Sequence, residues 1–330
     1  MMRLLIAITG IVIAMAMGFA TAANLDSNAI RKQAKNFFEP LPKSMPGSEN
    51  DTAAKIALGE KLYFENALSA TGIQSCNTCH RLDEGLGGVD NLKFSPGAIK
   101  GAMGTRNSPT VWNAGFHFVQ FWDGRAADLR GQAKGPILNP VEMAMPSEEA
   151  AVAAIKKAGY EGEFNKVFGP DSLTYDNIAE AIAAFERTLI TKDRFDDFLN
   201  GQDNFTQQEL AGLKAFMDNS CTICHSGPLL GGRLYQKLGL MKQYPNQQDQ
   251  GRYDATHNEA DRMMFKVPSL RNITKTEPYF HDGFTHQLDE AVKMMAEHQL
   301  NKKLDEQTTA SIVAFLKTLE NQRKFKRSTQ

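Results

Sequence analysis

Hydrophobic residues recur at helical spacing in several separate stretches of this chain. The spacing predicts helices at residues 52–63, 148–158, 176–191, 206–217, 288–295 and 312–319. The fourth begins with a capping box, in which Thr206 is followed three residues later by Glu209. No alternation of strand type is apparent, and residues 24–51 form a polar stretch with three prolines that favours an extended segment. The fold class is therefore predicted to be mainly α, with long ordered loops at 81–110 and 226–286, and loops of that length usually carry function.

The N-terminus has the pattern of a secretory signal peptide. Arg3 precedes an apolar run from Leu4 to Phe19, and the small residues Ala20-Thr21-Ala22 form a cleavage signal. A retained membrane anchor is the alternative, because the run is about as long as a minimal membrane span. We expect cleavage after residues 1–22 and export. No second apolar run of spanning length follows, so no membrane span is expected after cleavage.

Length and charge limit the possible partners. The 330 residues allow two domains, for which we expect residues 23–192 and 193–330. The chain has 37 Lys and Arg against 38 Asp and Glu, a formal charge of −1. Such a balance excludes a broad electrostatic grip on nucleic acid or on an anionic membrane surface.

All four cysteines belong to two copies of the motif C-x-x-C-H. Cys76 and Cys79 precede His80, and the motif returns 145 residues later as Cys221, Cys224 and His225. This is the attachment signature of a c-type haem, in which two thiols bond the haem and the histidine becomes an axial iron ligand. A zinc site would need two more ligands per motif, and a thioredoxin-like dithiol would not need the histidine. We therefore predict two covalently bound haem c groups and no disulfide.

The sixth ligand of each iron decides between electron transfer and chemistry, because an occupied position blocks peroxide or oxygen. Fourteen methionines could serve, and so could the five histidines His117, His257, His281, His286 and His298. Spacing alone does not choose among them.

The order and spacing of several motifs resemble those of bacterial di-haem cytochrome c peroxidases over essentially the whole mature chain. Besides the two cysteine motifs, the resemblance rests on residues 87–90 (GGVD), 106–110 (RNSPT), 120–126 (QFWDGRA), 132–136, 141–143 (VEM), 268–272 (PSLRN) and 278–281 (PYFH). It implies a periplasmic enzyme that reduces hydrogen peroxide with electrons from a small c-type cytochrome or a cupredoxin. It also suggests a homodimer.

The resemblance assigns a role to each haem. The N-terminal haem would be the low-potential peroxide site, with Glu142 as its acid–base residue, Gln132 as a hydrogen-bonding neighbour and Pro136 shaping the pocket. The C-terminal haem would receive electrons and have Met295 as its second ligand. Helical spacing agrees, because Met295 shares a face with Val292.

The resemblance also implies a tryptophan and a calcium site that lie between the two haems. Trp122 matches a tryptophan that shortens the electron path. Asn107, Thr276 and Pro278 match a calcium site, the last two through backbone carbonyls, and Ca²⁺ accepts such neutral oxygens.

The chain departs from the family pattern in one loop. Many members close the oxidised peroxide site with a histidine before the RNSPT motif, but no histidine lies between His80 and His117, and Ala98 occupies the position. We expect an open haem that needs no reductive activation; the alternative is that Met103 or His117 blocks the iron. A di-haem electron carrier and a di-haem oxidase of a partner protein are the rival functions. The oxidase relative has a tyrosine where this chain has Met295.

Overall fold

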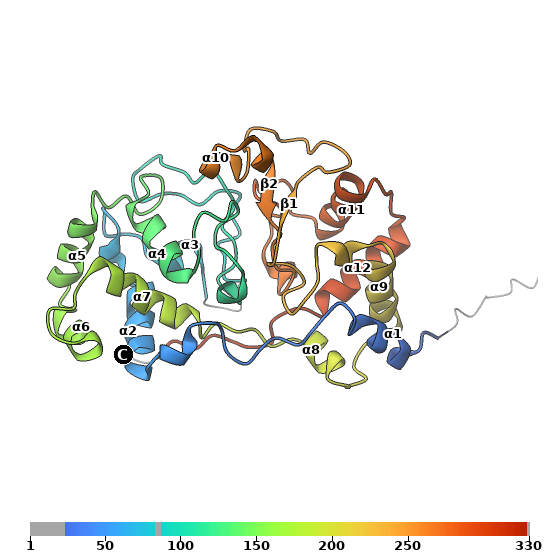
Figure 1. Ribbon diagram of the computed structural model, residues 1–330, viewed down its shortest axis with the longest axis horizontal. Helices are drawn as coiled ribbons and strands as arrows, with labels where there is room; N and C mark the ends of the chain where they lie inside the picture. Colours follow the sequence, from blue (N-terminus) through green and yellow to red (C-terminus); the bar gives the residue numbers. More distant parts are fainter. Residues whose placement is uncertain (1–23, 83–86, 329–330) are drawn as a thin grey trace, which may run out of the picture.

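The computed structural model describes residues 24–82 and 87–328, which form two lobes along the long axis of the molecule (Figure 1). The expected signal peptide, residues 1–22, lies outside the described residues. The α-helices in the described residues are α1 (Ser27–Ala34), α2 (Ala53–Tyr63), α3 (Cys76–Cys79), α4 (Leu129–Leu138), α5 (Glu148–Lys157), α6 (Glu161–Phe168), α7 (Tyr175–Glu186), α8 (Arg194–Leu199), α9 (Gln207–Asp218), α10 (Tyr253–Thr256), α11 (Leu288–Leu300) and α12 (Glu306–Lys317). The strands there are β1 (Tyr235–Lys237) and β2 (Met264–Lys266), so the mainly α prediction is confirmed.

Each lobe has its own hydrophobic core around a pair of packed helices. In the first lobe α2 packs on α7, and the core residues come from positions 58–189. In the second lobe α9 packs on α12, and the core draws on positions 30–38 and 195–319. The strands and the long loop 239–263 lie between the lobes at the top of Figure 1. Each helix pair therefore supports one of the two cysteine motifs.

Two of the predicted segments differ in the structure. Residues 24–51 are not wholly extended, because Asp26 caps α1 and the apolar stripe of Ile30 and Ala34 is buried in the second core. The helix expected at 176–191 ends at Glu186, as α7. Arg187 then turns away to form an ion pair with Asp51 at 2.5 Å.

Several elements were missed by the sequence patterns, among them β1, β2, α4, α6, α8 and α10. Strands β1 and β2 pair antiparallel, with Tyr235 opposite Lys266, but three residues are too few to show an alternating pattern. Helix α4 contains Gly131, Gly135 and Pro136, the residue types with the lowest helix propensity. Packing against α7 stabilises it despite that composition.

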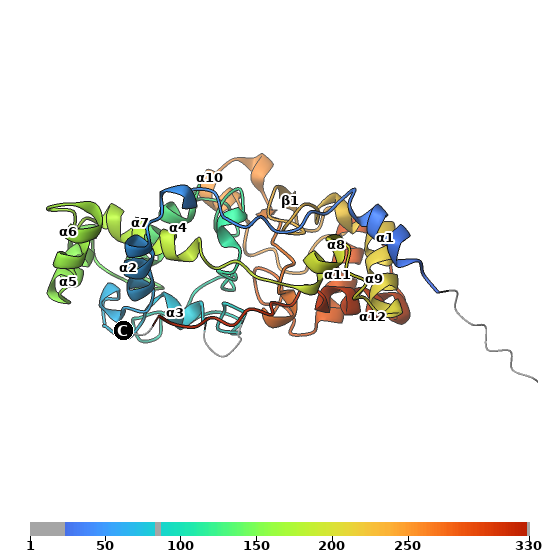
Figure 2. The same ribbon diagram turned by 90° about the horizontal axis from the view of Figure 1, so that it is seen from below.

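The ends of the described chain cross over between the lobes (Figure 2). Helix α1 and Phe38 precede residue 193 but pack in the second core. The C-terminal segment returns to the first lobe, where Phe325 stacks on Phe64 and the Ser328 amide donates to Glu60 at 2.6 Å. The two lobes are thus tied together at both ends. Within residues 24–82 and 87–328, no helix has the length and apolar character needed to cross a membrane.

Candidate functional site

The first cysteine motif lies on a short helix that its own sequence caps. Ser75 and Thr78 form a reciprocal capping box at the start of α3, which carries Cys76 and Cys79. His80 follows as the last residue of the turn, and its backbone amide donates to the Cys76 carbonyl at 3.0 Å. Both sulfurs and the imidazole therefore face one cavity.

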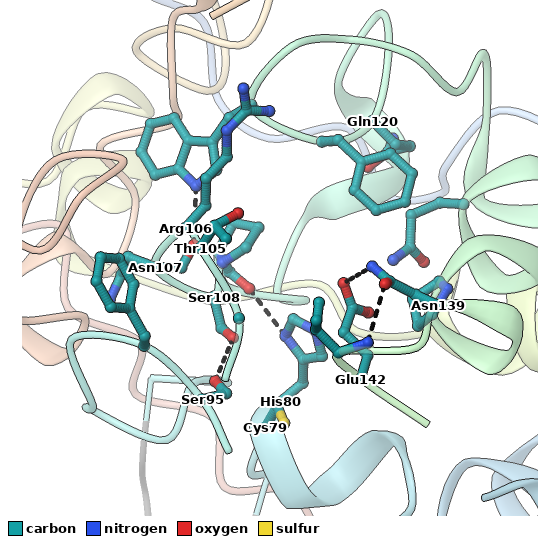
Figure 3. Close-up of a pocket in the computed structure, with 18 of the residues that line it drawn as sticks. Cys79, His80, Ser95, Thr105, Arg106, Asn107, Ser108, Gln120, Asn139 and Glu142 are labelled. Carbon is teal, nitrogen blue, oxygen red and sulfur yellow. Dashed lines mark hydrogen bonds between the residues drawn. The ribbon is translucent and has the colours of Figure 1, made fainter. Parts of the chain in front are cut away.

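The His80 ring is held in the orientation of a metal ligand (Figure 3). Its Nδ1 lies 2.9 Å from the Pro109 carbonyl oxygen, and the Tyr63 hydroxyl donates to the His80 carbonyl at 2.5 Å. A carbonyl partner keeps the proton on Nδ1 and leaves Nε2 free to bind a metal. Burial lowers the His80 pKa, which favours the neutral imidazole that metals bind.

The first cavity, with a volume of about 980 Å³, brings together residues that are far apart in the sequence. Gln132, Glu142 and Trp122 all line it together with His80. Gln132 and Pro136 lie on α4, and the chain then folds back at the end of that helix. The Met143 amide donates to the Pro136 carbonyl at 3.1 Å, which fixes the turn that carries Glu142.

Glu142 is a partly buried carboxylate with a defined orientation. The Asn139 side-chain amide donates to its Oε1 at 2.8 Å, three residues earlier on the same turn (Figure 3). Burial raises the pKa of Glu142 above its ordinary 4.5, and the nearby Arg125 and the Asn139 hydrogen bond partly oppose that rise. A carboxyl group with a raised pKa beside a ligand-binding cavity is suited to proton transfer.

The loop that departs from the family pattern is docked beside this carboxylate. The Ala98 amide donates to the Glu142 carbonyl at 2.6 Å, and the Ala98 side chain is buried but does not line the cavity. Met103 does line the first cavity, with 48% of its surface exposed. His117 lines the second cavity rather than the first.

The second cysteine motif follows α9, whose predicted capping box of Thr206 and Glu209 is confirmed. Cys221 begins a single 3₁₀ turn, η5 (Cys221–Ile223), and Cys224 and His225 come directly after it. The His225 Nδ1 lies 3.0 Å from the Leu230 carbonyl oxygen, so its Nε2 is free in the same way as that of His80.

A second, smaller cavity of about 240 Å³ lies over His225. Helix α11 forms one side of it and contributes Met295 together with Leu288 and Val292. Met294, the residue before it on α11, does not line the cavity and belongs to a hydrophobic cluster with Leu238, against which Met295 also packs. Of the two methionines, only Met295 therefore lines the cavity, in agreement with the helical spacing.

The two cavities share a wall. Residues 107–110 and Trp122 line both of them. The Trp122 indole N–H donates to the Asn107 carbonyl at 2.9 Å, and the Trp122 carbonyl accepts from the Lys266 amide at 2.8 Å. The indole is therefore fixed between the two lobes.

Of the residues expected to bind calcium, only Asn107 belongs to this wall. Asn107, Thr276 and Pro278 all line the second cavity. The Asn107 amide donates to the His281 carbonyl at 2.7 Å, and the Asn91 side chain donates to the Glu277 carbonyl at 2.8 Å. These bonds join the first lobe to the 275–281 segment of the second.

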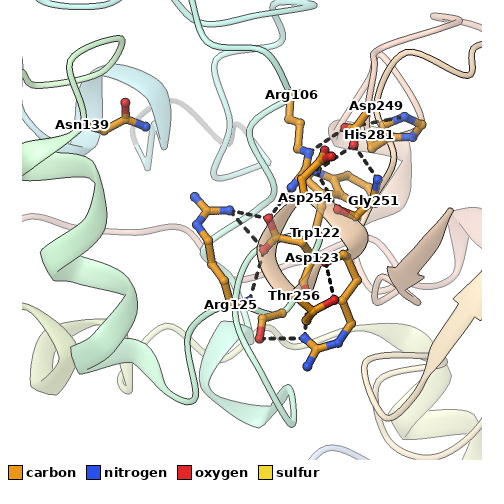
Figure 4. A network of polar contacts seen from close by, with 12 residues as sticks. Arg106, Trp122, Asp123, Arg125, Asn139, Asp249, Gly251, Asp254, Thr256 and His281 are labelled. Atoms are coloured by element: carbon orange, nitrogen blue, oxygen red, sulfur yellow. Dashed lines mark hydrogen bonds and ion pairs between the residues drawn. The ribbon is translucent and has the colours of Figure 1, made fainter. Parts of the chain in front are cut away.

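Sequence reasoning missed a polar network at the mouth of the first cavity (Figure 4). Arg106 forms ion pairs with Asp123 and Asp249, both at 2.6 Å, and a longer one with Asp254 at 3.4 Å. Arg125 pairs with the same Asp123 at 2.9 Å. Arg106 and Asp123 each stood inside a recognised motif, but Asp249 and Asp254 lie 143 and 148 residues after Arg106, where no local pattern points to them.

The residues around both cavities fit a covalently bound haem better than a zinc ion. Across the part of the chain that the structure describes, no cluster of three His, Cys, Asp or Glu side chains could hold a metal ion. Burial raises the pKa of Cys79 and of Cys221 to about 11 each, so neither thiol is poised as a thiolate ligand. Each motif instead places two thiols and one neutral imidazole at a cavity, which is the donor set of haem c.

Comparison with known proteins supports the same conclusion. A family model described as "Di-haem cytochrome c peroxidase" matches residues 53–204. The chain is 47% identical to a cytochrome c551 peroxidase of Nitrosomonas europaea, over 82% of this chain and 80% of that protein. It is 41% identical to the cytochrome c551 peroxidase of Pseudomonas aeruginosa, over 92% of this chain and 89% of that protein. A crystal structure of a MauG-like protein associated with microbial copper homeostasis matches with a TM-score of 0.76 and 26% identity, covering 86% of this chain and 94% of that one.

Both relatives are peroxidases, and their sequence identities of 47% and 41% are high enough to indicate a shared function as well as a shared fold. The two c-type haem motifs of this chain agree with a family of di-haem enzymes. These findings favour a haem enzyme over a simple electron carrier. The chain therefore belongs to the di-haem cytochrome c peroxidase family and is itself a peroxidase, an oxidoreductase that works with haem.

Proposed function

We propose that this peroxidase reduces hydrogen peroxide at the first cavity with electrons that enter at the second. Two electrons and two protons convert each hydrogen peroxide to two water molecules. One observation carries the proposal: a partly buried carboxylate with a raised pKa, Glu142, lines the first cavity together with His80, whereas the described lining of the second has no Asp or Glu. Met295 lies in the second cavity instead. The two cavities are thus suited to different tasks.

The chain's own residues supply the proton transfer. Bound haem supplies the iron that accepts electrons and passes them to peroxide. The Glu142 carboxylate accepts a proton from one peroxide oxygen and returns it to the other, which leaves as water. Asn139 holds the carboxylate at 2.8 Å, and the Gln132 amide is a further hydrogen-bonding group at the same cavity.

The peroxide site is open in the oxidised enzyme and needs no reductive activation. Ala98 stands where many family members have a closing histidine, and its loop is docked on the Glu142 backbone. Met103, the other candidate for a blocking ligand on this loop, is half-exposed, and His117 lines the second cavity. The test is turnover by the fully oxidised, calcium-loaded enzyme with reduced cytochrome c, followed from the first milliseconds. Full activity without a lag supports the open site, and a lag abolished by pre-reduction would contradict it.

A variant with a histidine at position 98, Ala98→His, provides a second test of the open site. Ala98 is 3% exposed, so the larger side chain of Ala98→His does not fit the docked position and should free the loop to close over the haem. We expect a lag that pre-reduction removes. Lys100→His, at an exposed position of the same loop, is the matched control and should show none.

His225 and Met295 would hold the iron of the second haem, which would supply electrons to the haem at His80. Trp122 lies in the wall that both cavities share, which supports its role as the connecting group. Asn107 and the backbone carbonyls of Thr276 and Pro278, which line the second cavity, would hold a calcium ion. Its removal with a chelator should lower turnover, and added Ca²⁺ should restore it.

The donor is a small c-type cytochrome or a cupredoxin, and the enzyme is a periplasmic homodimer. The N-terminal signal pattern supports export, and the names of the two relatives, which are cytochrome c551 peroxidases, support a cytochrome donor. Turnover with each purified donor, and the mass of the holoenzyme in solution, test these points separately.

A further inference from the structure

Lys266 is a buried cation that the proposed mechanism does not use. The residue is 5% exposed, on strand β2, and burial lowers its pKa to about 7. No ion pair joins it to a carboxylate within residues 24–82 and 87–328. Burying an ammonium group without a counter-charge is unfavourable, so such groups are normally paired.

The polar partner of Lys266 is a histidine from the other lobe. The Lys266 Nζ lies 2.9 Å from the Nδ1 of His117. Because the ammonium can only donate, Nδ1 accepts, and the proton of the neutral ring is then on Nε2. That Nε2 is buried and has no hydrogen-bond partner in the described structure.

The backbone keeps this pair in place. The Lys266 amide donates to the Trp122 carbonyl at 2.8 Å, and the ring of His117 packs against Gly232, where a Cβ would lie 2.5 Å from its Cδ2. The Gly232 amide in turn donates to the Val267 carbonyl at 2.8 Å. Lys266 and His117 both line the second cavity.

Two donors thus lie at a cavity that fits a haem: the Lys266 ammonium, whose hydrogen-bond partner in the described structure is His117, and the His117 Nε2–H, which has none there. A haem carries two propionate carboxylates on the edge opposite its thioether bonds. We propose that the Lys266 ammonium, with the His117 Nε2–H beside it, binds a propionate of the second haem and raises the reduction potential of that haem. The inference rests on the proposed haem at His225 and Met295. A positive charge near the iron favours the reduced state, so the pair would help this haem to accept electrons.

The test is a potentiometric titration of the second haem in the holoenzyme, with Lys266→Met compared with the wild type. We expect the equilibrium constant for reduction to fall about tenfold, which is about 59 mV for a one-electron couple. Lys237→Met removes the same charge from an exposed position on the paired strand β1 and should leave the potential unchanged. Lys266→Arg keeps the charge and should keep the potential within about twofold.

A second measurement does not depend on a variant that folds. In a crystal structure of the wild-type holoenzyme, a propionate oxygen should lie within about 3.2 Å of the Lys266 Nζ. An equal potential in Lys266→Met and the wild type, or a propionate that points away from Lys266, would overturn the inference. Neither the reduction potential nor the crystal structure depends on peroxide turnover. If the proposed peroxidase mechanism were wrong but the inference about Lys266 were right, the wild-type enzyme would show no turnover, and Lys266→Met would still lower the potential of the second haem.

Discussion

Helix α2 in the first lobe and helix α9 in the second each approach a partner helix through a glycine. A Cβ at Gly59 would lie 1.8 Å from the Ala181 carbonyl oxygen, and a Cβ at Gly212 would lie 1.8 Å from that of Ser311. Both partners lie on the second helix of their lobe, α7 or α12. The contact that sets the distance between the helices is therefore repeated.

The aromatic packing next to each glycine is repeated as well. Four residues after Gly59, the ring of Tyr63 meets Phe185 with centroids 5.2 Å apart. Four residues after Gly212, the ring of Phe216 meets Phe315 at 5.4 Å. Two edge-to-face pairs in corresponding places support the idea that the two lobes are copies of one haem-binding unit.

The lobes differ in what covers the cavity opposite the histidine. The turn after α4 supplies a carboxylate in the first lobe, and α11 supplies a thioether in the second. The comparison teaches that a repeated helix pair carries each cysteine motif, whereas the covering segments differ; under the proposed function, these segments would determine which haem reacts and which transfers electrons. Changes to the covering segments should alter function, and changes to the helix pairs should alter stability.

The largest expected effect comes from the carboxylate. Glu142→Gln removes the proton acceptor but keeps the shape, so turnover with peroxide should fall by about 10²- to 10⁴-fold. Steady-state turnover measures this, and the absorption of both haems checks that they are attached. Glu149→Gln removes an exposed carboxylate of the same lobe and should leave turnover unchanged. Comparable turnover in Glu142→Gln and the wild type would remove Glu142 from the mechanism.

In the second lobe, Met295→Leu removes the thioether without much change in volume. A Met ligand raises the potential of a haem, so we expect the potential of the second haem to fall by more than about 59 mV, a tenfold change in equilibrium. Met294→Leu, at the neighbouring residue that does not line the cavity, is the control. If both variants had the wild-type potential, another residue would be the ligand.

Substitutions in the two helix pairs should have smaller effects, which act on stability and are similar in the two lobes. Gly59→Ala and Gly212→Ala should each destabilise the holoenzyme by about 1–3 kcal/mol, because the added methyl group overlaps the backbone of the partner helix. Denaturant unfolding measures this. Gly162→Ala adds a methyl group to α6 in open space and should be neutral or slightly stabilising. Unequal costs for the first two variants would show that the repeat is not equivalent in packing.

The sequence predicted the features that depend on local pattern. Helical spacing placed Met295 and not Met294 on the cavity side, and the capping box at Thr206 marked the start of α9. It missed α4, because glycine and proline hide a helix that tertiary packing stabilises. It also missed the partnership of Lys266 with His117, because residues 149 positions apart meet only when the two lobes come together.

The smallest expected effect is a shift in the pH dependence of activity, which tests whether Glu142 is the group that accepts the proton. Glu142 accepts a proton only when ionised, so activity should decline as the pH falls through its pKa, which burial raises above 4.5. Asn139→Ala removes a hydrogen bond that favours the ionised form, so the Glu142 pKa should rise further and the acidic limb of kcat/KM should move to higher pH. Asn165→Ala, on α6, is the control. An unmoved acidic limb in Asn139→Ala would assign that limb to a group other than Glu142.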